Sequence, residues 1–199
     1  DQNIARIRKA AERAGIAGRT TFVIVGDNGF EDVTESVAPN VLLAEAGLVE
    51  RDGSKVAGWK ALGHSSSGSM AVYAKDAESA KKAREVLERG AGKYYTILDR
   101  ARLDDLGYNP LAAFALEAAE GISFSGSVAG TFAGNRTSKG QHGYLPTKPR
   151  LATGFVASGS GVRSCVIERM RIIDIAPTLA RLLSLEMKEV EGAALDFAE

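Results

Sequence analysis

The apolar positions along the chain switch between helical spacing and short continuous runs. Residues 3–15 place Ile4 and Ile7 at helical spacing, with arginine and lysine on the other face, and Gly15 is suited to end that helix. Residues 20–25, TTFVIV, are instead an unbroken apolar run, which is typical of a strand buried on both faces. A helix, a short loop and an apolar strand in this order predict an α/β sheet.

The same reading predicts the remaining elements. Helices are expected over 38–49, 76–92, 99–107 and 174–185, and strands over 68–76, 93–98 and 151–159. Asp76 is placed to cap the second of these helices, and Pro177 falls in the first turn of the last one, where its missing N–H is tolerated. Residues 110–118 and 121–125 are expected to form a two-stranded antiparallel pair. The glycine-rich stretch 126–150 is expected to be a long loop.

This order of elements also predicts the domain organisation. Residues 68–125 read strand, helix, strand, helix, strand, strand, which suggests a small α/β subdomain. It would be inserted into a core formed by residues 1–67 and 126–199.

Composition excludes several classes of function. The 199 residues are 45% hydrophobic, enough for one core, and the 25 basic and 25 acidic side chains balance to zero net charge. A neutral chain has no broad electrostatic footprint for a nucleic acid polymer or an anionic membrane. No apolar run approaches the roughly 18 residues of a membrane span. The single Cys165 excludes an internal disulfide, and nothing in the composition assigns a compartment.

Two side chains stand out as candidates for chemistry. Asp27 follows the apolar run directly, where α/β sheets bind ligands, although Asp-Asn-Gly is also a favoured turn sequence. His142 lies between glycine and glutamine in the expected long loop, and can be read either as a metal ligand or as a surface histidine. The other histidine, His64, has polar neighbours and is interpreted as a surface residue.

Three segments, taken in order, resemble one known family. TTFVIVGDNGFEDV (20–33), GQHGYLP (140–146) and the stretch from ATGFVASGSGV to IERMRIIDIAPTLARLLSL (152–185) are similar to the type I phosphodiesterase/nucleotide pyrophosphatase family of the alkaline phosphatase superfamily. The resemblance implies part of an alkaline-phosphatase-like sheet sandwiched by helices. It also implies a metal-dependent hydrolase that acts on phosphate esters.

The resemblance implies a role for three residues. Members of the family hold two divalent ions, typically zinc, between aspartate and histidine side chains, and the ions stabilise displacement at phosphorus. By this resemblance Asp27 binds one ion, Asn28 stands where the family has a histidine for that same ion, and His142 binds the other ion. An amide is a poor zinc ligand, so Asn28 departs from the family pattern.

The resemblance also implies that part of the site lies outside this chain. The nucleophile and the other metal ligands belong to the N-terminal half of the family fold, and the chain is expected to begin after that half. We therefore expect weak or absent metal binding and no hydrolysis by this chain alone. We also expect a second chain, or self-association, to cover an exposed sheet edge. The alternative is a degenerate or engineered scaffold of the same fold that acts in binding or assembly.

Overall fold

The structure is a computed structural model that describes residues 1–197, apart from the side chain of residue 138. The chain divides into two compact units. We call Asp1–Gly26 with Gly154–Glu199 the terminal unit, and Asp27–Thr153 the central unit. The expected boundaries at residues 68 and 125 divide the chain differently, and that domain assignment stays a prediction.

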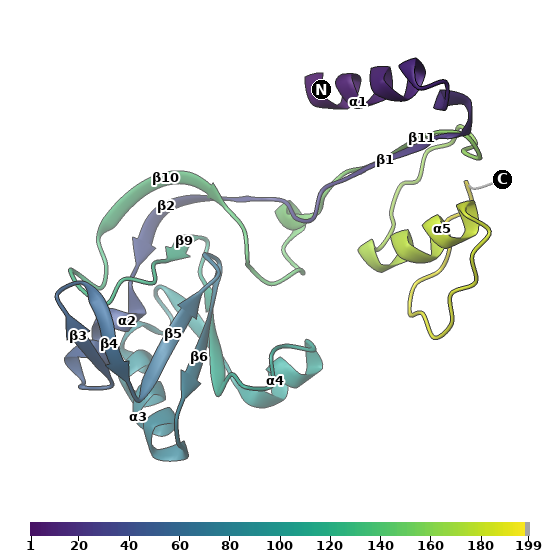
Figure 1. Ribbon diagram of the computed structural model, residues 1–199. Coiled ribbons are helices and arrows are strands. Elements are labelled where there is room, and N and C mark those ends of the chain that lie inside the picture. The colour runs from purple at the N-terminus through teal and green to yellow at the C-terminus, as the bar shows by residue number, and fades with distance from the viewer. Residues whose placement is uncertain (198–199) are drawn as a thin grey trace. The chain divides into compact units, whose positions relative to one another are not determined.

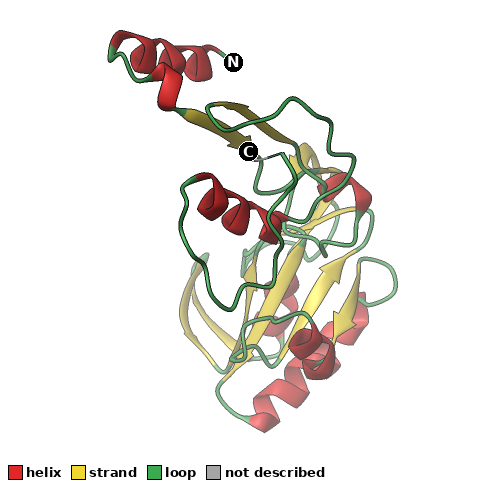
Figure 2. Ribbon diagram, turned by 90° about the vertical axis from the view of Figure 1, so that its right-hand side faces the viewer, coloured by secondary structure: helices red, strands yellow, loops and turns green. Residues whose placement is uncertain are grey.

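Among its described residues, the terminal unit contains two α-helices and a two-stranded ribbon. Its elements are α1 (Gln2–Arg13), β1 (Thr21–Val25), β11 (Phe155–Gly159) and α5 (Ile175–Leu182). All four were expected from the sequence. β1 runs antiparallel to β11, and these two strands form a sheet by themselves (Figures 1 and 2).

The burial predicted for the first apolar strand is wrong. In β1, Ile24 is 38% exposed and Val25 is 44% exposed. A strand in the middle of a covered sheet would bury both faces, but β1 has one strand partner among the described residues.

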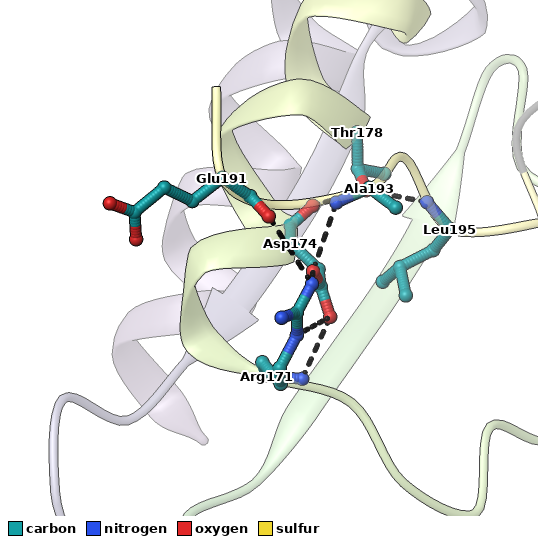
Figure 3. Close-up of polar contacts among 6 residues, drawn as sticks. All are labelled: Arg171, Asp174, Thr178, Glu191, Ala193 and Leu195. Carbon is teal, nitrogen blue, oxygen red and sulfur yellow. Dashed lines mark hydrogen bonds and ion pairs between the residues drawn. The ribbon is translucent and has the colours of Figure 1, made fainter. Parts of the chain in front are cut away.

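Residues of the Asp-Ile-Ala-Pro-Thr segment (174–178) form hydrogen bonds with the chain that follows α5 (Figure 3). The Asp174 carboxylate accepts hydrogen bonds from the backbone N–H of Arg171 at 2.9 Å and of Ala193 at 3.0 Å, and its Oδ1 lies 2.9 Å from Nη2 of Arg171. The hydroxyl of Thr178 donates to the carbonyl of Asp174 at 2.6 Å and accepts from the N–H of Leu195 at 2.9 Å. These buried groups therefore hold residues 193–195 against the helix.

The central unit is built on a four-stranded antiparallel sheet. Its strands, in spatial order, are β5 (Ala61–Ser65), β6 (Ser69–Ala74), β8 (Phe114–Ala118) and β7 (Tyr95–Leu98). The helices of this unit are α2 (Pro39–Glu45), α3 (Ala77–Leu87) and α4 (Arg100–Asp105). Asp76 caps α3 as predicted, accepting from the N–H of Ser79 at 2.7 Å.

Alternate residues of β6 face two separate cores. Met70 and Val72 belong to a cluster that includes residues of α2 and α3, whereas Ala71 belongs to a cluster with Leu103 of α4. Because side chains alternate across a strand, these helices cover opposite faces of the sheet. Figure 1 shows α4 apart from α2 and α3, on the other side of β6.

A second sheet in the central unit carries the candidate site. It orders β10 (Asn135–Gln141), β2 (Glu31–Val37) and β9 (Gly121–Phe124), with β10 antiparallel and β9 parallel to β2. A separate hairpin joins β3 (Val49–Asp52) to β4 (Lys55–Trp59).

Two expectations are corrected by this sheet. The predicted pairing of residues 110–118 with 121–125 is wrong, because β8 and β9 enter different sheets and β9 pairs with the distant β2. The predicted loop 126–150 contains β10. The order of elements over 68–125 is as predicted, and the chain is mixed α/β. Within residues 1–197 no helix combines the length and apolar character needed to cross a membrane.

Candidate functional site

The three candidate ligands lie at one end of the β2 and β10 pair. Asp27 and Asn28 lie just before β2 begins, and His142 follows directly after β10 ends. Glu31 is the register partner of Gln141, so the chain entering β2 runs beside the chain leaving β10. The rings of Phe30 and His142 meet edge to face, with their centroids 5.9 Å apart.

The backbone around Asp27 is held by close contact with a neighbouring segment. The N–H of Asn28 donates to Oδ1 of Asp27 at 3.0 Å. The N–H of Gly29 donates to the carbonyl of Leu151 at 2.9 Å. A Cβ at position 29 would overlap the carbonyl oxygen of Arg150, so this approach requires glycine. Asp27 itself is exposed.

The segment after His142 is fixed by equally close contacts. The carbonyl of His142 accepts from the N–H of Gly68 at 2.8 Å. Gly143 has a φ of +83°, and a Cβ there would overlap the carbonyl oxygen of Ser66. The buried hydroxyl of Tyr144 donates to a carbonyl of β9 at 2.6 Å. These contacts therefore fix the backbone at His142, whose side chain is exposed.

The candidate ligands do not by themselves make a complete zinc site. They offer one carboxylate, one imidazole and the Oδ1 of Asn28, which is buried and has no hydrogen-bond partner. Among the described residues, no group of three or more His, Cys, Asp or Glu side chains is arranged to hold a metal. Zinc sites in proteins use at least three protein ligands, and an amide oxygen is a poor one. The donor set of this chain therefore does not fit the dinuclear centre that the resemblance implies.

Sequence reasoning missed one buried acid next to this segment. Glu117 of β8 is 6% exposed, and its Oε1 accepts from the N–H of Leu145 at 3.0 Å. Burial raises the pKa of the Glu117 carboxyl, and the Leu145 N–H and Lys148 oppose that rise. A single glutamate in the apolar stretch FALEA was the available signal. The remaining histidine, His64, is exposed in β5, in agreement with its interpretation as a surface residue.

Comparison with protein families gave one match. The model of the type I phosphodiesterase / nucleotide pyrophosphatase family matches residues 1–145, which include Asp27, Asn28 and His142. A comparison with curated protein sequences gave no match.

Comparison with solved structures gave similar folds. Human ectonucleotide pyrophosphatase / phosphodiesterase 5 is 16% identical with a TM-score of 0.73, and the match covers 96% of this chain and 48% of that chain. The murine protein, in an inactive variant in complex with AMP, is 17% identical with a TM-score of 0.71 over the same shares. The chain thus spans about half the length of these structures, and it has part of the α/β fold expected from the sequence.

Proposed function

Because the chain belongs to the type I phosphodiesterase / nucleotide pyrophosphatase family, we propose that it is one part of a metal-dependent hydrolase of phosphate esters. The observation that carries this proposal is the register of β2 and β10. It supports a shared location for Asp27 and His142, which are more than a hundred residues apart in sequence.

The chain would contribute its residues to a site completed by other protein. In the proposed function, Asp27 and His142 supply a carboxylate and an imidazole to two different ions, and Asn28 takes a position where an imidazole is usual. Bound divalent ions would supply Lewis-acid chemistry at the phosphate. The close contacts at Gly29 and Gly143 would hold Asp27 and His142 in place. The 199-residue chain alone is proposed not to hydrolyse phosphate esters, because its donor set is incomplete.

A second candidate function is a scaffold of the same fold that binds or assembles without catalysis. The observation that favours it is Asn28, whose buried Oδ1 has no partner and which replaces a stronger ligand. In this case the fold is kept while the metal site is lost.

A complementation experiment separates the two functions. The chain is mixed with the N-terminal half of a family member, and hydrolysis of bis(p-nitrophenyl) phosphate is measured with Zn²⁺ present. If the chain is part of a hydrolase, the mixture should hydrolyse the substrate, and Asn28→His should raise the rate. Asp27→Ala and His142→Ala should each abolish activity, and the control His64→Ala should leave it unchanged. The scaffold predicts no activity in any mixture. Zinc-dependent turnover by the unmixed chain, lost in Asp27→Ala, would contradict the proposed inactivity.

The terminal unit supports a partner as well. We propose that a second chain, or another copy of this one, covers the exposed β1 and β11 ribbon.

A further inference from the structure

A cavity of about 240 Å³ lies in the central unit, and neither Asp27 nor His142 lines it. Its apolar wall comes from β7, α4 with the turn after it, and the segment after His142, with the side chains Leu98, Leu103, Leu106, Tyr108, Leu145 and Pro146. A dry cavity of about 150 Å³ can hold benzene. This cavity is therefore large enough for an aromatic ring with a short substituent, and smaller than the pockets that take whole drug-sized ligands.

One polar side chain stands out in the wall of the cavity. Glu117 and Ala115 both line it, since residues two apart on β8 point to the same face. The side chain of Glu117 is 8% exposed. Its Oε1 accepts from the N–H of Leu145, whereas its Oε2 is buried without any hydrogen-bond partner. A buried acceptor without a partner is unfavourable, so a donor that reaches it after a small rotation of the Glu117 carboxylate would be bound with a gain.

The charge of Glu117 is already balanced from within the protein. Nζ of Lys148 lies 3.6 Å from Oε1 of Glu117. The same ammonium donates to the carbonyl of Ala118 at 3.2 Å and lies 4.2 Å from the centroid of the Tyr144 ring. Because three groups hold Lys148, it stays beside the carboxylate. A ligand that adds a charge would meet this neutral pair, so a neutral hydrogen-bond donor fits best.

We propose that this cavity binds a small neutral aromatic molecule, or the aromatic part of a larger one, through a hydroxyl or N–H that donates to Oε2 of Glu117. The ring would pack against the leucine side chains of the wall, and the donor would satisfy the one unpaired carboxylate oxygen. The inference goes beyond the proposed function, because it uses neither Asp27 nor His142 and needs no metal.

The test compares phenol with anisole, which has the same ring but no hydroxyl donor. Each is titrated into the ¹⁵N-labelled chain, and the amide signals of Gly143 and Leu145 are followed by NMR. Phenol is expected to shift these signals and to bind roughly tenfold more tightly than anisole, the effect of one hydrogen bond to a charged acceptor.

Two matched variants test whether Glu117 is the acceptor. Glu117→Gln keeps an oxygen for the N–H of Leu145 but replaces the second oxygen with an amino group, so phenol should bind only as weakly as anisole. Glu120→Gln makes the same change of charge at an exposed position three residues away and should bind phenol like the wild type. Dispersed amide signals in each variant check that it folds.

Several results would overturn the proposal. Equal affinities for phenol and anisole in the wild type would show that the cavity has no acceptor for the hydroxyl, whether or not Glu117→Gln folds. Phenol binding in a folded Glu117→Gln at wild-type affinity would remove Glu117 from the site. Shifts confined to amides far from Gly143 and Leu145 would place the binding elsewhere.

Discussion

Asp27 and Asp174 both belong to motifs that resemble the family, but their carboxylates have different surroundings. Asp27 is exposed, and its carboxylate accepts a hydrogen bond from the N–H of the next residue, Asn28. Asp174 is 7% exposed and lies within hydrogen-bonding distance of donors on Arg171 and Ala193. The exposed carboxylate of Asp27 can therefore contact a ligand, whereas the carboxylate of Asp174 stabilises the fold of the terminal unit.

The protonation of Asp174 should therefore control the stability of the terminal unit. The Arg171 side chain, followed by the N–H groups of Ala193 and Arg171, lowers the pKa of Asp174 from 3.8 to about 2. A carboxyl whose folded pKa is lowered stabilises the fold above its unfolded pKa, and this contribution is lost as the pH falls from 3.8 toward 2. Hydrogen exchange of the Ala193 amide should show its protection fall over this window.

The variant Asp174→Asn gives the matched measurement. It should lower the protection of the Ala193 amide at pH 6 and remove the loss between pH 4 and 2. The control Glu186→Gln, at an exposed position of the same unit, should behave like the wild type. Wild-type protection that stays constant down to pH 2 would contradict the role given to Asp174.

Among the helices and strands, the amphipathic helices and the apolar strands could be predicted from the sequence, whereas the polar strand β10 could not. α3 was predictable because its capping residue and its apolar face can both be recognised within the local sequence itself. β10 has the sequence NRTSKGQ, which has no apolar alternation, and its existence depends on pairing with the distant β2. Pairing with the distant β2 likewise places β9 in a different sheet from β8. Asp27 and His142 were candidates from their positions in the sequence, and Asn28 came from the family resemblance. The burial of Glu117 depends on packing that local sequence does not specify.

The contact between Gly143 and the turn before β6 should stabilise the central unit. Gly143→Ala places a Cβ against the carbonyl oxygen of Ser66 in a left-handed backbone conformation, and should destabilise the unit by about 1–3 kcal/mol. Urea unfolding followed by the fluorescence of Trp59, the single tryptophan, reports on this unit. The control Gly126→Ala has open space and should change stability by less than about 0.5 kcal/mol. Equal unfolding midpoints for the two variants would remove this role from Gly143.

At the scale of the whole molecule, exposed apolar side chains are concentrated in one unit. Only three of the fifteen exposed large apolar side chains among the described residues lie in the central unit, namely Phe30, Val56 and Leu111. The others belong to the terminal unit, which has fewer residues. Exposed apolar side chains that lie together on a surface are typical of interaction sites, and those of β1 and β11 lie on paired strands. A two-stranded ribbon is also marginal in stability unless something packs against it.

We therefore expect the chain to associate through the β1 and β11 ribbon when no other protein covers it. Light scattering coupled to size exclusion should give a mass above the 21.0 kDa of the chain. Ile24 and Val156 are cross-strand partners, 38% and 56% exposed. The double variant Ile24→Thr and Val156→Thr keeps β-favouring residues but removes apolar surface, so its mass should fall toward that of the monomer. The control Leu111→Thr, at a site 78% exposed in the central unit, should associate like the wild type. A wild-type chain that elutes as a monomer at every concentration tested would show that the ribbon needs no cover.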